Sequence, residues 1–157
     1  MSRRGHIGLG GAVLLITTIS ASAQVDKVEM HTVGISCGSC AAISEVYLRR
    51  LDGIAKISIS KSKEQVMVFY KPEARFRPEE LRGALGKTGV KVAQFRISAH
   101  GQVQQEGDKK FLVIGNDRFR LFRSPHLPTG PIALEATLND EVRPMEIEVI
   151  SFTALKN

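Results

Sequence analysis

The 157-residue chain has only two cysteines, no tryptophan, and no apolar run of the roughly 18 residues that a bilayer-spanning helix needs. Two cysteines exclude a small scaffold held together by several disulfides. The absence of a glycine period and of low-complexity tracts excludes collagen-like and fibrous structures. A hydrophobic share of 43% with charges of both signs excludes a disordered chain. The sequence is that of a globular protein, with room for one compact domain or two small ones.

Sequence motifs of catalysis are also missing. There is no Ser-His-Asp signature, no glycine loop that would cradle a phosphate and no calcium-binding loop pattern. Adjacent carboxylates occur at Glu79 and Glu80, where they suit the start of a helix. No cluster of methionines is present that could form a thioether copper site. We therefore expect a protein that is not an enzyme.

The N-terminus has the three parts of an export signal. Arg3 and Arg4 precede an apolar stretch at residues 7–19, and Ala21-Ser22-Ala23 forms a small-residue cleavage site. We expect residues 1–23 to be a signal peptide and the mature chain to be periplasmic or secreted, with no membrane-spanning segment. A buried N-terminal helix is the alternative, which the glycines and threonines of this stretch disfavour. Removing two arginines lowers the net charge from +6 to +4, too little to indicate nucleic-acid binding.

The first part of the mature chain alternates between strand-like and helix-like periods. Val28, Met30 and Thr32 fall on one face of an extended segment, which predicts a strand. The expected elements are strand 28–34, helix 40–51, strand 54–60, strand 65–70, a helix that begins at Pro78, and strand 90–97. The apolar residues expected on the buried faces of the two helices are Ile43, Tyr47, Leu48, Leu51, Leu81, Ala84 and Leu85. This order predicts an α+β, ferredoxin-like βαββαβ domain over residues 25–97.

Residues 98–157 carry no helical period. Short extended runs at 98–103, 109–115, 118–123, 132–138 and 145–152 are separated by glycine, proline and Asn-Asp turns. Five short strands predict a small all-β domain, either a barrel, for example of the OB type, or a sandwich. In residues 118–123 arginines alternate with apolar residues, and the ordinary interpretation is a strand with its arginines in solvent.

Cys37 and Cys40 are the candidate functional residues, and they lie between the first strand and the first helix. Two intervening residues allow both sulfur atoms to meet at one point, and the helix N-terminus stabilises thiolate. A soft cation that accepts two thiolates fits this pair: Cu(I) or Hg(II), or Zn(II) and Cd(II) with additional ligands. In an oxidising compartment a disulfide or a redox centre is also open.

Several segments together resemble the heavy-metal-associated domain: GISCGSC at 34–40, LRRLDGI at 48–54, VMVFY at 66–70 and LRGALGKTGVKV at 81–92. That family includes periplasmic mercury-binding proteins, copper chaperones and modules of metal-pumping ATPases, and the resemblance covers about residues 25–97. It implies that Cys37 and Cys40 are the metal ligands. It also implies that Cu(I) or Hg(II) is passed on by ligand exchange to a membrane metal transporter or another thiol protein.

The chain departs from the family pattern at three positions. Ile35 stands where methionine is usual, and Val90 where an aromatic residue or lysine is usual. Ser44 takes a usually apolar helix position, with Ile43 expected to replace it in the core. Without a lysine at position 90, Lys87 is the nearest sequence candidate for a cation that screens the metal site.

Two other functions remain open for the Cys-x-x-Cys pair. A thiol–disulfide oxidoreductase would use the same motif, but a thioredoxin-like domain needs a longer α/β fold and a facing cis-proline. A degenerate metal module could also serve as an interaction scaffold. His31, six residues before Cys37, is expected at an edge or in solvent rather than as a third ligand, and His100 and His126 are expected in exposed turns.

Overall fold

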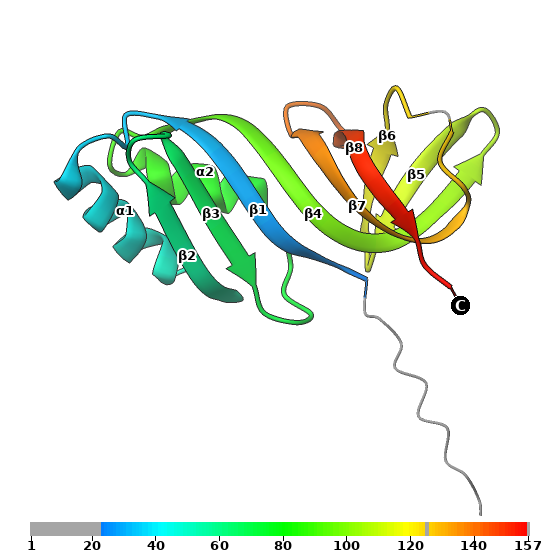
Figure 1. Ribbon diagram of the computed structural model, residues 1–157, viewed down its shortest axis with the longest axis horizontal. Helices are drawn as coiled ribbons and strands as arrows, with labels where there is room; N and C mark the ends of the chain where they lie inside the picture. The colour runs from blue at the N-terminus through cyan, green and yellow to red at the C-terminus, as the bar shows by residue number, and fades with distance from the viewer. Residues whose placement is uncertain (1–22, 125, 157) are drawn as a thin grey trace, which may run out of the picture.

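The computed structural model describes residues 23–124 and 126–156 (Figure 1). The predicted signal peptide at 1–23 lies, except for Ala23, outside the described residues. Neither of the two helices in the described ranges has the length and apolar character needed to cross a bilayer. The elements are β1 (Gln24–Val33), α1 (Gly38–Arg49), β2 (Ile54–Ser60), β3 (Gln65–Tyr70), α2 (Pro78–Gly86), β4 (Lys91–Glu106), β5 (Lys109–Ile114), β6 (Asp117–Leu121), β7 (Gly130–Asn139) and β8 (Glu146–Ala154).

The first six elements follow the predicted βαββαβ order. Their strands form the antiparallel arrangement β2-β3-β1-β4, and α1 and α2 pack against each other, α1 also against β2 and α2 against β4 (Figure 1). The period of two in β1 is confirmed, because Val28 and Met30 are fully buried and Thr32 is nearly so. Burial of Leu81, Ala84 and Leu85 likewise confirms the predicted inner face of α2.

The inner face of α1 differs from the prediction at one position. Ser44 is fully buried, whereas the side chain of Ile43 is 49% exposed. Ser44 lies four residues before the buried Leu48, so the helical period turns Ser44, and not Ile43, toward the core. The hydroxyl of Ser44 is satisfied there by Thr88 Oγ1 at 2.8 Å, and Thr88 donates in turn to the carbonyl of Leu85. A buried polar contact therefore links α1 to the segment that follows α2.

Strand β4 joins the two parts of the molecule. The sequence predicts strands at 90–97 and 98–103 and leaves open that the first runs straight into the second; β4 does so, unbroken from Lys91 to Glu106. One edge of β4 pairs first with β1 and then with β5, and the other edge pairs with β7. The predicted boundary at Ser98 lies inside this strand, so both parts share its backbone. Whether residues 25–97 and 98–157 fold as two domains stays a prediction.

The strands of the C-terminal part close on themselves. The neighbours are β4-β5-β6-β8-β7, and β7 pairs again with β4, while β6 and β8 run parallel in an otherwise antiparallel circuit. Gly101 lies where β4 passes from β1 to β5, and a Cβ there would be only 2.7 Å from the carbonyl oxygen of Val113. The close approach of the two backbones requires glycine at this position. The side chains that fill the interior include Leu112, Phe119, Ile132, Ala136 and Ile147.

An ion pair connects α2 to the loop between β7 and β8. The guanidinium of Arg82 donates to both carboxylate oxygens of Asp140, at 2.7 and 2.8 Å, and to the carbonyl of Val92 at 2.7 Å. The hydrogen bonds from Arg82 hold the pKa of Asp140 below its usual range, although partial burial opposes this shift. The pair is a second connection, besides β4, between the N-terminal part and the barrel.

We expect Asp140→Asn to lower the free energy of unfolding at neutral pH by about 1.5–3 kcal/mol, the usual contribution of hydrogen bonds to a charged group. The pKa of Asp140 is lower in the folded than in the unfolded state. Its contribution to stability is therefore complete above the unfolded pKa of about 3.9 and is lost as the pH falls through the folded pKa. Denaturation curves of both proteins at pH 7 and at low pH measure the effect. A difference between the two proteins that is equal at both pH values would contradict this role of Asp140.

Candidate metal centre

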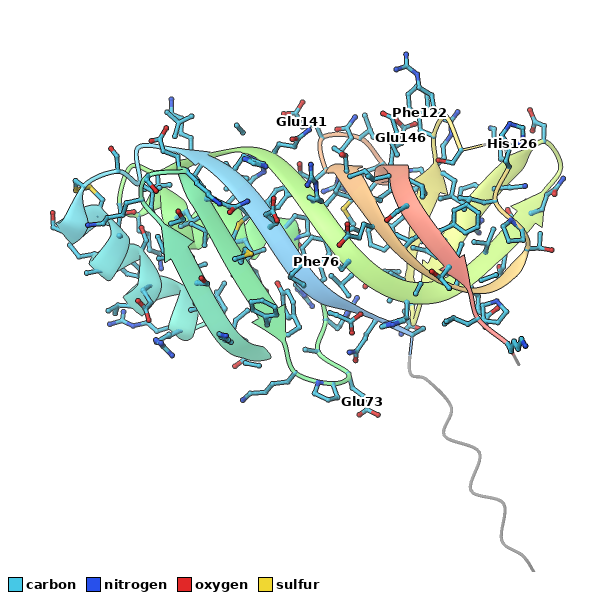
Figure 2. All side chains as sticks on the ribbon, in the orientation of Figure 1. Glu73, Phe76, Phe122, His126, Glu141 and Glu146 are labelled. Carbon is cyan, nitrogen blue, oxygen red and sulfur yellow. A yellow bond between two sulfur atoms is a disulfide. The ribbon has the colours of Figure 1, made fainter. Side chains whose placement is uncertain are left out.

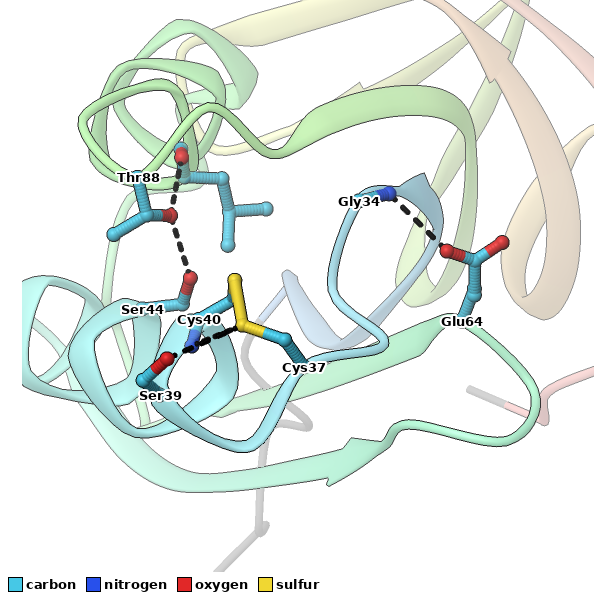
Figure 3. Close-up of a disulfide and its surroundings, with 8 residues drawn as sticks. Gly34, Cys37, Ser39, Cys40, Ser44, Glu64 and Thr88 are labelled. Atoms are coloured by element: carbon cyan, nitrogen blue, oxygen red, sulfur yellow. Dashed lines mark hydrogen bonds between the residues drawn. A yellow bond between two sulfur atoms is a disulfide. The ribbon is translucent and has the colours of Figure 1, made fainter.

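The loop that carries the cysteines is held at its base by the turn between β2 and β3. Gly34 leaves β1 with φ of +98°, which favours glycine, and its N–H donates to Glu64 Oε1 at 3.1 Å (Figure 3). The carbonyl of Glu64 accepts from both the backbone N–H and the hydroxyl of Thr32, each at 2.8 Å. Ile35 is fully buried beneath the loop. These contacts fix where the chain turns from β1 toward α1.

The two cysteines lie at the start of α1 and are joined by a disulfide. Cys37 is the N-cap residue, and its Sγ accepts a hydrogen bond from the backbone N–H of Cys40 at 3.0 Å. The hydroxyl of Ser39 lies 3.3 Å from the same sulfur (Figure 3). The S–S distance is 2.08 Å and the Cα atoms are 5.2 Å apart. The spacing therefore brings both sulfurs to one point in this oxidised form, as expected, although their assignment as metal ligands stays a prediction.

The sulfur pair can be reached from solvent. Cys37 is exposed and Cys40 is half-buried, while Gly38 and Ser39 between them are exposed. A loop with these exposures leaves room for another molecule to approach the sulfurs. The backbone N–H of Cys40, in the first turn of α1, donates to Cys37 Sγ, and the helix N-terminus favours negative charge on sulfur when the bond is reduced.

Lys61 is a cation beside this loop. A Cβ built on Gly38 would lie 3.9 Å from Lys61 Nζ, so this ammonium group reaches the segment between the cysteines. Lys87 Nζ lies 4.9 Å from the ring centroid of Tyr47 on α1, and its role as a screening cation stays a prediction. Lys61 was not among the residues predicted for the site, although its turn had to lie near the end of β1. The signal was the strand order, because β1 pairs antiparallel with β3 and the turn precedes β3.

The histidines do not join the cysteines. His31 Nε2 lies 3.4 Å from Glu29 Oε1 on β1. His100 was expected in a turn but lies in β4, half-buried, with Nδ1 2.6 Å from Asp26 Oδ2. His126 is exposed, as predicted. Within residues 23–124 and 126–156, no three His, Cys, Asp or Glu side chains come together as a metal site. Any metal held at Cys37 and Cys40 would have two protein ligands, which suits Cu(I) or Hg(II) better than Zn(II).

Known proteins resemble part of this chain. No family model matches it. A 74-residue stretch is 31% identical to the mouse copper-transporting ATPase 2 and 30% identical to the human one. This stretch makes up 47% of this chain and 5% of each ATPase. Similar solved structures include the CopZ metallochaperone, 24% identical over 43% of this chain and 98% of that one, with a TM-score of 0.40. Another is the N-terminal domain of a potential copper-translocating P-type ATPase from Bacillus subtilis. It is 30% identical over 44% of this chain and 85% of that domain, with a TM-score of 0.38.

The match to the copper-transporting ATPases confirms the resemblance to the heavy-metal-associated domain that the sequence motifs indicate. It covers only a small part of the ATPases, so their activity does not carry over to this chain.

Proposed function

We propose that the chain is an exported carrier of a soft metal ion, which Cys37 and Cys40 bind as a dithiolate and pass on by ligand exchange. The observation that carries this proposal is the meeting of two accessible sulfurs at the N-terminus of α1. The disulfide must first take up two electrons and two protons from an external thiol reductant. Metal binding then releases the two protons and forms two metal–sulfur bonds.

The different exposure of the two cysteines supports an order for the exchange. Cys37 is exposed and Cys40 is half-buried, so a thiolate from a partner approaches on the Cys37 side. It displaces Cys37 from the metal first, and a second thiolate then displaces Cys40. The recipient in this proposal is a membrane metal transporter or another thiol protein, and the location is periplasmic or secreted.

Two observations favour Cu(I) over Hg(II) as the ion. The curated relatives are copper-transporting ATPases by name. In addition, a dithiolate complex of Cu(I) has a net charge of −1, whereas that of Hg(II) is neutral, so the nearby Lys61 stabilises the copper complex more.

We expect Lys61→Met to weaken Cu(I) binding about two- to fivefold, corresponding to the 0.5–1 kcal/mol of an exposed charge pair, and to leave Hg(II) binding almost unchanged. Lys63→Met, two residues away in the same turn, is the matched control and should alter neither affinity. Competition titrations of the reduced proteins measure the affinities for both ions. Equal losses for Cu(I) and Hg(II) would show that Lys61 does not act through the charge of the complex.

For residues 98–157 we propose an OB-type barrel that positions the metal module. The support is the closed five-strand circuit with its parallel β6–β8 pair. In this proposal β4 and the Arg82–Asp140 ion pair set the orientation of the barrel relative to the cysteine loop.

A thiol–disulfide oxidoreductase is the second candidate, because the disulfide between Cys37 and Cys40 favours it. An insulin-reduction assay beside a Cu(I) competition titration separates the two functions. The carrier predicts tight Cu(I) binding by the reduced protein with little turnover of insulin. Rapid turnover with negligible Cu(I) affinity would favour the oxidoreductase, and failure of both would favour a scaffold.

A further inference from the structure

A basic cleft lies on the barrel, formed by β5, β6 and the segment that follows β6. Its volume is about 440 Å³, and its lining includes Lys109, Lys110, Arg120 and Arg123, with Asp108 as its one acidic lining residue among those described. Figure 2 shows Phe122 and Glu146 at this end of the molecule, far from helix α1 and the cysteine loop. The cleft is therefore separate from the candidate metal centre.

Two of the four cations are held by contacts within the protein, and two are available. Arg120 Nη1 lies 3.0 Å from Glu146 Oε1, and Lys110 Nζ donates to the carbonyl of Leu127 at 2.6 Å. In contrast, Lys109 and Arg123 are exposed and form no ion pair within residues 23–124 and 126–156. Uncompensated positive charge therefore faces this cleft.

The backbone of Arg123 is strained. Its φ is +51°, a conformation that favours glycine. Both neighbours are anchored to β8: the N–H of Phe122 donates to the carbonyl of Ile147 at 2.8 Å, and Ser124 Oγ accepts from the N–H of Val149 at 3.2 Å. Ser124 Oγ also donates to the carbonyl of Phe122. Position 123 thus has arginine although glycine would adopt this backbone conformation with less strain. The hydrogen bonds of the two neighbouring residues hold the turn in place.

This strained turn places a guanidinium at the cleft. The Arg123 group lies 5.0 Å from the ring centroid of Phe122, which is itself 39% exposed and lines the same cleft. Stacking on the ring leaves the N–H donors of the guanidinium at its edge free to bind an anion. A planar guanidinium suits phosphate and carboxylate groups because it can donate two parallel hydrogen bonds to them.

From these observations we infer that the cleft binds a small anion carrying several phosphate or carboxylate groups, with Arg123 and Lys109 as its main contacts. The volume lies within the range of small-molecule sites, about 300–1,000 Å³, which favours a compact multivalent anion over a polymer. This inference does not depend on metal binding at Cys37 and Cys40.

Calorimetric titration of the full chain with tripolyphosphate and with citrate, in about 150 mM salt, tests the inference. We expect saturable binding of at least one of these probes at one site, and the stronger one identifies phosphate or carboxylate as the preferred group. Arg123→Gly should weaken that binding about tenfold or more, because it removes a charged hydrogen-bond donor. Its melting temperature should stay the same or rise, because glycine relieves the strain at φ of +51°.

Lys71→Ala is the matched control, since Lys71 is exposed, carries the same charge and lies outside the cleft. Its affinity for the probe should stay within about twofold of the wild-type value. Absence of saturable binding to the wild-type protein would overturn the inference. So would an unchanged affinity in Arg123→Gly, or an equal loss in Lys71→Ala, which would indicate nonspecific attraction to net charge.

Discussion

Reduced Cys37→Ser protein should bind Cu(I) far more weakly than the wild type while keeping its fold. Loss of a residue that merely supports a metal ligand lowers affinity about 10–100-fold, and loss of one of two ligands should exceed that range. The fold should persist because Cys37 is exposed, and a serine hydroxyl can accept the N-cap hydrogen bond from the N–H of Cys40. Competition against a chromophoric Cu(I) chelator measures the affinity, and circular dichroism monitors the fold.

Ser36→Ala is the control for this experiment. Ser36 is exposed and adjacent to Cys37, and it contributes no sulfur. The affinity of the Ser36→Ala protein for Cu(I) should remain within a few-fold of the wild-type value. A Cys37→Ser protein that binds Cu(I) as tightly as the wild type would show that the assignment of the ligands is wrong.

Phe95→Ala should destabilise the whole chain by about 3–5 kcal/mol, the usual cost of removing a fully buried phenylalanine. Phe95 lies in β4 opposite Met30 of β1 on one side and Leu138 of β7 on the other. Its ring also packs edge-on against Phe76, with centroids 6.4 Å apart, and the guanidinium of Arg82 lies 4.8 Å from its centroid. The side chain therefore supports both parts of the molecule.

Because both parts share β4, denaturant unfolding should give one transition that moves as a unit in Phe95→Ala. Phe152→Ala is the control, since that ring is 45% exposed and its loss should cost less than about 1 kcal/mol. Two transitions, of which the substitution shifts only one, would show that residues 25–97 and 98–157 unfold independently. That result would contradict the structural role that we assign to the shared strand.

The parts of the fold that the sequence predicts well are those set by local patterns. The period of two in β1 and the apolar positions of α2 each specify one buried face, and the structure has both. The Cys-x-x-Cys spacing is local as well. It brings the sulfurs together across the junction of the loop and the first helical turn.

The features that the prediction missed depend on distant contacts. Ser44 is buried because Thr88, 44 positions away, satisfies its hydroxyl, whereas hydrophobicity alone placed Ile43 inside. The sequence left the continuity of β4 across position 98 open, and the pairing with β1, β5 and β7 decides it. Lys61 approaches the cysteine loop through the pairing of β1 with β3, so it is found from the strand order and not from residues near the cysteines in the sequence.

Native mass spectrometry of the reduced and the oxidised chain, titrated with Cu(I) under anaerobic conditions, tests the central claim most directly. The proposed dithiolate carrier predicts one tightly held Cu(I) per reduced chain and none in the chain whose Cys37–Cys40 disulfide is intact. Equal copper binding by both forms, or no binding by the reduced form, would contradict the claim that these two sulfurs hold the metal.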